Sequence, residues 1–88
     1  MLEKTIETYL VKKIRDLGGI AYKFVSPARR SVPDRIVLLN GRAVFVEVKA
    51  PGKKATRLQL KEHEKIREQG FLVLVIDSKV GVDDAFPG

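Results

Sequence analysis

The hydrophobic and polar positions of residues 32–49 form a pattern that predicts a β-hairpin. Two β-branched, apolar runs flank the dipeptide Asn40-Gly41. Asn-Gly favours a two-residue type I′ turn, because both turn residues need positive φ. Counting outward from that turn sets the register of the hairpin and places Asp34 directly opposite Glu47 near its open end.

Apolar periodicity elsewhere predicts two helices and two further strands. The predicted elements are a helix over 2–17, a strand over 20–25, a helix over 56–69 capped by Thr56, and a strand over 71–76. The last strand is an unbroken apolar run, which is typical of burial on both faces. Strand 42–49, the second helix and strand 71–76 form a βαβ unit, so the two strands should be parallel with a right-handed crossover. The order predicts an α/β fold in which helices flank a mixed β-sheet.

Asp34, Glu47 and Lys49 are the first candidates for chemistry. The predicted register brings all three to one side of the hairpin. Like charges directly opposed destabilise a hairpin, so two adjacent carboxylates indicate a bound cation, and Mg²⁺ prefers oxygen ligands of this kind. The alternative is that Asp34 is a turn residue and the other two form an exposed strand face. A β-bulge would also break this register.

Length, charge and cysteine content narrow the function. The chain has 88 residues, which predicts one small domain, and a core of this size benefits from a second subunit or a bound metal. The net charge of +6 favours a polyanionic partner, and nucleic acid fits best. The absence of cysteine excludes disulfides and thiolate metal sites, and it suits a reducing, cytoplasmic compartment. No apolar run approaches the roughly 20 residues of a membrane span.

Two basic loops border the carboxylate pair. Arg29 and Arg30 lie in a predicted loop over 26–31, just before the hairpin. Lys53 and Lys54 lie in a second predicted loop, which directly follows it. Both pairs are placed to contact phosphates, since such contacts position a protein on nucleic acid. The alternative is that they are solvated surface charges.

The second predicted helix carries a stripe of three residues on one side. Gln59, His63 and Ile66 are spaced four and three positions apart, so they are neighbours on the helix surface. His63 is the only histidine, and no acid–base partner for it is visible in the sequence. We therefore interpret His63 as a residue that packs the helix rather than a catalytic one.

Both ends of the chain carry residues whose roles the pattern leaves open. On the first helix, Glu3 is directed further toward the apolar face than Glu7 is. A glutamate at either position would also suit the helix macrodipole. In the tail, Val80, Val82 and Phe86 are spaced for either a short docking segment or a subunit contact.

The hairpin and its flanks resemble a known nuclease signature. Pro33-Asp34, a 12-residue interval and then Glu47-Val48-Lys49 resemble the PD-(D/E)xK motif. The longer strings Ser26–Asp34, Val46–Lys53 and Thr56–Gln59 resemble the VRR-Nuc branch of that superfamily, over about residues 3–75. One departure is Ser31, which stands where many relatives carry glycine.

The resemblance implies a fold, a reaction and a role for each candidate residue. It implies a restriction-endonuclease-like core and an Mg²⁺- or Mn²⁺-dependent DNA nuclease that acts on branched DNA, such as Holliday junctions, as a homodimer. The implied metal ligands are Asp34, Glu47, the Val48 carbonyl and Glu3, with Glu7 as the alternative to Glu3. Lys49 and Gln59 would position water or phosphate, and Arg29, Arg30, Lys53 and Lys54 would hold the DNA backbone. The rival readings are a non-catalytic nucleic-acid-binding module and a nuclease subunit of a larger repair complex.

Overall fold

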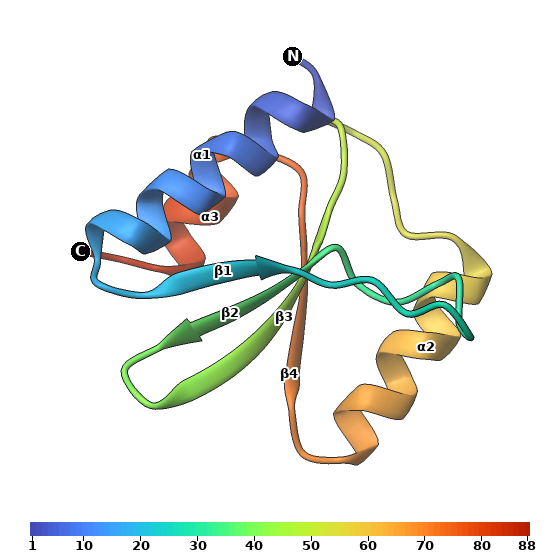
Figure 1. Cartoon of the computed structure of the whole chain (residues 1–88). Coiled ribbons are helices and arrows are strands. Elements are labelled where there is room, and N and C mark those ends of the chain that lie inside the picture. Colours follow the sequence, from blue (N-terminus) through green and yellow to red (C-terminus); the bar gives the residue numbers. More distant parts are fainter.

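The computed structural model, which describes residues 1–88, has three helices packed on one four-stranded sheet (Figure 1). The elements are α1 (Glu3–Asp16), β1 (Ile20–Lys23), β2 (Arg35–Leu39), β3 (Arg42–Val48), α2 (Arg57–Glu68), β4 (Leu72–Ile76) and α3 (Lys79–Ala85). The strand order is β1-β2-β3-β4. The first two pairings are antiparallel and β3 pairs with β4 in parallel, so the predicted mixed sheet is confirmed.

The hairpin between β2 and β3 has the predicted turn and register. Asn40 and Gly41 have φ values of 53° and 75°, as a type I′ turn requires. The pairs run without a bulge from Leu39 opposite Arg42 to Arg35 opposite Val46. The open end of the hairpin therefore brings Asp34 and Glu47 together.

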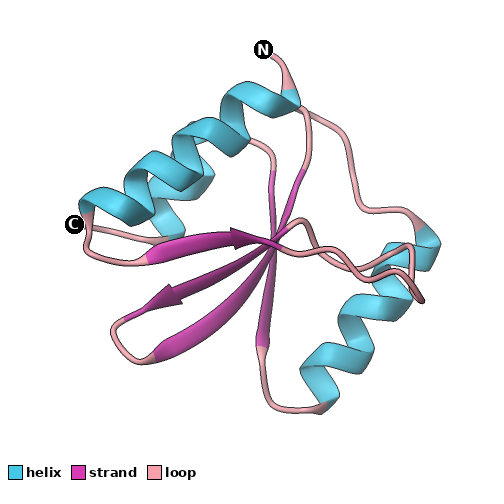
Figure 2. Ribbon diagram, in the orientation of Figure 1, coloured by secondary structure: helices cyan, strands magenta, loops and turns pink.

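The two faces of the sheet have different environments. Figure 2 shows α1 and α3 against one face and α2 against the other. The apolar core lies on the first face, where α1 buries Ile6, Leu10 and Ile14 at one-turn spacing. Because side chains alternate along a strand, Val46 points into this core while its neighbour Glu47 points toward α2.

Strand β4 differs from the prediction that it is buried on both faces. It is an edge strand, and Leu72 and Val75 remain 47% and 41% exposed. Only Val73 and Ile76 are buried along it. An apolar run alone does not distinguish a central strand from an edge strand, because the difference depends on whether another strand pairs beside it.

The C-terminal tail forms a third helix, which the predicted order αβββαβ did not contain. Ser78 caps the N-terminus of α3, and its hydroxyl accepts a hydrogen bond from the Gly81 N–H. Val82 and Phe86 are buried in the core beside α1, whereas Val80 is exposed. The tail is thus a docking segment of its own chain, and the order is αβββαβα. None of the helices is long and apolar enough to cross a membrane.

Candidate active site

The end of the β2–β3 ladder positions Asp34. Arg35 and Val46 form the last regular pair, so the next hydrogen-bonded pair would join Pro33 to Val48. Proline has no N–H, and the Val48 N–H instead donates to Asp34 Oδ2 at 2.8 Å. In a strand the N–H and C=O of one residue point to the same side, so the Val48 carbonyl also faces this gap in the ladder.

Glu47 is a buried carboxyl group beside Asp34. It is 2% exposed. Burial, a hydrogen bond to Asp34 and the negative charge of Asp34 together raise the pKa of Glu47 to about 8, and Lys49 opposes them. At neutral pH without a cation, Glu47 therefore retains a proton for most of the time. Positive charge placed beside the pair would favour the ionised form of Glu47.

Gln59 connects the start of α2 to Glu47. The Thr56 hydroxyl accepts from the Gln59 N–H, and Gln59 Oε1 accepts from the Thr56 N–H at 2.9 Å, which forms a capping box. The amide nitrogen of the same side chain donates to Glu47 Oε2 at 3.3 Å. The helix cap therefore sets the orientation of Gln59 toward the carboxylate.

His63 has a polar partner that the sequence did not reveal. Its side chain is fully buried, and its Nε2 lies 3.2 Å from Glu47 Oε1. Burial, together with the charges of Arg67 and Lys49, lowers the pKa of His63, which favours the neutral ring. We assign the proton to Nε2, which then donates to Glu47, while the buried Nδ1 has no partner. His63 is thus buried between α2 and the sheet, as a packing residue would be, but the expectation that it has no acid–base partner is wrong.

One signal for the role of His63 was present in the sequence. His63 lies one helical turn after Gln59, on the same side of α2. Once Gln59 is assigned to the carboxylate site, that spacing directs His63 toward it as well. Its burial, however, depends on how α2 docks on the sheet.

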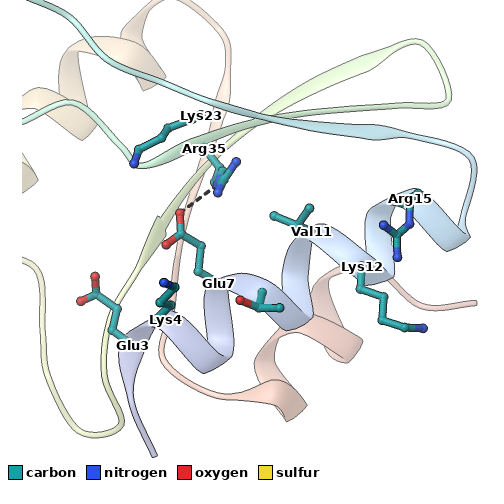
Figure 3. Close-up of a pocket in the computed structure, with 9 residues that line it drawn as sticks. Glu3, Lys4, Glu7, Val11, Lys12, Arg15, Lys23 and Arg35 are labelled. Carbon is teal, nitrogen blue, oxygen red and sulfur yellow. Dashed lines mark hydrogen bonds and ion pairs between the residues drawn. The ribbon is translucent and has the colours of Figure 1, made fainter.

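The two glutamates of α1 have different partners. Glu7 Oε2 forms a 2.9 Å ion pair with Arg35 Nε. Glu3 is exposed and makes no ion pair, and its charge contributes to the raised pKa of Glu47. In Figure 3 Glu7 points at Arg35, while Glu3 lies apart at the start of the helix. Of the two, the structure leaves Glu3 free to join the carboxylate pair.

The basic loop residues come from two separate loops. Arg29 makes a bidentate ion pair with Glu62 of α2, with one N–O distance of 2.8 Å. Arg29 and Arg30 line a shallow hollow beside α2. Lys53 and Lys54 are exposed in the loop after β3 and form no ion pair. The predicted phosphate contacts are thus accessible, although Arg29 would have to exchange Glu62 for a phosphate.

The donor groups suit a hard divalent cation. No group of three or more His, Cys, Asp or Glu side chains is arranged to hold a metal ion. Asp34 and Glu47 nevertheless lie beside each other, and the Val48 carbonyl faces the same gap in the ladder as Asp34. All three are oxygen donors of the kind that Mg²⁺ and Mn²⁺ prefer. The raised pKa of Glu47 shows that its ionised form is disfavoured in the metal-free site, and a bound cation would stabilise that form. The residues therefore fit such an ion.

The fold and the carboxylate site together define a small nuclease-type α/β domain, and comparisons with known proteins agree. No family model matches the chain. It is 56% identical over 78 residues to "Putative nuclease p44" of Acyrthosiphon pisum secondary endosymbiont phage 1, covering 88% of this chain and 84% of that protein. A solved VRR_NUC domain is 36% identical with a TM-score of 0.88, covering 93% of this chain and 90% of that one. The chain belongs to the VRR-Nuc family of nuclease domains.

Proposed function

We propose that residues 1–88 form one divalent-metal-dependent endonuclease domain that hydrolyses phosphodiester bonds in DNA. The observation that carries this proposal is the buried Glu47 carboxyl group beside Asp34 at the end of the hairpin. A binding module has no need of this arrangement, which is unfavourable without a cation. Membership of a nuclease family and the net charge of +6 support the same reading.

Four groups would hold the metal ion. They are the carboxylates of Asp34, Glu47 and Glu3 and the carbonyl of Val48. When bound, Mg²⁺ or Mn²⁺ lowers the pKa of a bound water and stabilises negative charge on the phosphoryl oxygens. The protein holds its own donors in place through the Val48 N–H, which fixes Asp34, and through α2, which fixes Glu47.

Lys49 and Gln59 would act on the reacting groups. The positive charge of Lys49 acts on Glu47, so the ammonium group lies near the carboxylate pair. There it positions the attacking water and offsets the charge that develops in the transition state. Gln59 uses one amide hydrogen for Glu47 and keeps a second for water or the scissile phosphate.

The two basic loops would hold the DNA backbone on either side of the site. Arg29 and Arg30 approach from the loop before the hairpin, and Lys53 and Lys54 from the loop after it. Contacts of this kind give salt-sensitive affinity that is mostly independent of sequence. A homodimer would present two such sites to two strands, which favours branched DNA such as a four-way junction.

The test is cleavage of a labelled four-way junction and a matched linear duplex, with Mg²⁺, Mn²⁺ or chelator. Asp34→Asn removes the proposed metal ligand, and Asp84→Asn makes the same chemical change at an exposed residue of α3. We expect metal-dependent cutting that Asp34→Asn abolishes and Asp84→Asn retains. Equal cutting of both substrates by a protein that light scattering shows to be monomeric would overturn the junction preference. Salt-sensitive binding without cutting in any metal would favour the non-catalytic module or a missing partner subunit.

A further inference from the structure

The largest hollow on the surface does not lie over the carboxylate pair. It is a groove of about 590 Å³ between the outer face of α1 and the neighbouring ends of β1 and β2 (Figure 3). The residues that line it are Glu3, Lys4, Glu7, Thr8, Val11, Lys12, Arg15, Lys23 and Arg35. Only one of the nine is hydrophobic, and seven carry a charge, so charged side chains dominate the lining.

The groove has an excess of positive charge. Arg35 is neutralised by Glu7 and donates a further hydrogen bond to the Ala21 carbonyl. Lys12 is paired with Asp16. Lys4, Arg15 and Lys23 form no ion pair or side-chain hydrogen bond. Glu3 is the one unpaired acidic residue of the groove, so the three free cations leave a net positive charge that favours an anion.

The free cations are spaced as a line rather than a cluster. Lys4 and Arg15 are eleven residues apart on the outer side of α1, which corresponds to about 16 Å along the helix axis. One strand of B-form DNA carries a phosphate about every 3.4 Å of axis, so this length spans about five phosphates. Lys23 lies on the opposite wall, on β1 beside Arg35. The separation suits a chain of phosphates better than a single compact anion.

One end of the groove meets the candidate active site. Glu3 lines the groove, and its charge also acts on Glu47. We propose that the groove binds the nucleic-acid backbone on one side of the scissile phosphate, over about five nucleotides. This inference rests on the proposed function for the position of the cut. It adds Lys4 and Arg15 of α1 and Lys23 of β1 to the binding surface, and these two elements supply none of the four basic loop residues.

A pair of double variants tests the groove by binding alone. Arg15→Gln/Lys23→Gln removes two groove charges and leaves Lys4, beside Glu3, untouched. Arg42→Gln/Lys79→Gln removes one arginine and one lysine from exposed positions outside the groove. Both are made on an Asp34→Asn background, so that no DNA is cut. We expect the slope of log Kd against log salt to fall by about 1.8 for the groove pair and to stay unchanged for the other pair.

A second measurement locates the groove relative to the cut. The protein that retains Asp34 is given DNA substrates in which one side of the mapped cut, and then the other, is shortened below about five nucleotides. We expect KM to rise more on shortening the side that lies in the groove than on shortening the other side, and the groove pair to lose that difference. Equal salt slopes for the two double variants, equal sensitivity to both flanks, or no DNA binding at low salt would overturn the inference. If the salt slope falls only in the groove pair but the protein cuts no DNA in any metal, the groove would still be a nucleic-acid-binding surface, and the nuclease function would be rejected.

Discussion

At the scale of single residues, Glu47 links the geometry of the site to its chemistry. It lies on a strand whose neighbouring side chains enter the apolar core, yet it faces α2 and receives hydrogen bonds from Gln59 and His63. The same burial that fixes the carboxyl group in one position also disfavours its ionised form. The carboxyl group is therefore held in one position, and its ionised form lacks a compensating positive charge until a cation is added.

The raised pKa of Glu47 predicts how the metal-free protein responds to pH. The pKa is about 8 in the folded protein against an ordinary 4.5, so the folded state binds more protons between these values. Stability should therefore fall as the pH rises through this window. Glu47→Gln cannot ionise, so its melting temperature should change less there and exceed that of the unmodified protein above about pH 8. Calorimetry in chelator measures both curves.

Comparing the unmodified protein with Glu47→Gln distinguishes the contribution of Glu47 to the pH dependence of stability from that of His63. The lowered pKa of His63 acts in the opposite sense, since it reduces stability as the pH falls below the ordinary 6.5. Both proteins contain His63, so the difference between their curves reports on Glu47. If the two melting temperatures change in parallel from about pH 5 to about pH 9, the raised pKa of Glu47 would be contradicted.

His63 is predicted to position Glu47 rather than to react. His63→Leu keeps much of the volume but removes the donor to Glu47, and loss of such a supporting hydrogen bond typically costs about 10–100-fold in metal affinity or activity. His63→Gln has an amide N–H that can take the place of Nε2, so it should recover most of the loss. Mn²⁺ affinity by calorimetry measures this without turnover. Equal Mn²⁺ affinity in both variants and the unmodified protein would assign His63 a packing role only.

At the scale of elements, the N-terminus of α2 connects helix stability to the site. The capping box holds the Gln59 side chain by its carbonyl oxygen and leaves the amide nitrogen for Glu47. A sequence prediction recognises the cap from the Thr-x-x-Gln spacing. It does not show that the same glutamine reaches a carboxylate on a different element.

Thr56→Ala is predicted to have two separable effects. Loss of the cap should reduce the free energy of unfolding by about 1 kcal/mol. Gln59 should also become more mobile, which would lower kcat for DNA cleavage. Thr56→Ser keeps the hydroxyl group and should retain both properties, as measured by urea unfolding and steady-state kinetics. An alanine variant that is less stable but has an unchanged kcat would separate the cap from the positioning of Gln59.

At the scale of the whole molecule, α3 completes the core on the face opposite α2. Its burial of Val82 and Phe86 against α1 closes a surface that would otherwise expose apolar side chains. Tyr9 donates a hydrogen bond from its hydroxyl to Asp83 at 2.8 Å, which adds a polar contact at the same interface. The helix that carries Glu3 is thus held in place by the last residues of the chain.

Two valines of α3 test this arrangement. Val82 is fully buried and Val80 is 67% exposed, so the same substitution has different consequences. Val82→Ala should reduce the free energy of unfolding by about 2 kcal/mol, which lowers the melting temperature by roughly 8–16 °C in a domain of this size. Val80→Ala should change stability little. Similar losses in both variants would show that α3 is not docked as described.

Much of this molecule follows from local chemistry in the sequence. The apolar spacing in 2–17, the Asn40-Gly41 turn and the Thr56 cap each specify their element through residues close together in the chain. The turn also determines the hairpin register, and thereby the meeting of Asp34 with Glu47. These features depend on backbone propensity and side-chain period, which can be read without knowing the fold.

The tertiary structure decided the contacts between distant elements. The burial of His63 against Glu47, the pairing of Arg29 with Glu62 and the groove beside α1 depend on how helices dock on the sheet. The edge position of β4 depends likewise on which strands pair. Periodicity shows which side of an element is apolar, but it does not give the angle at which two elements pack or which polar groups then meet. For that physical reason the sequence by itself determined the carboxylate pair, and only the fold determined what surrounds it.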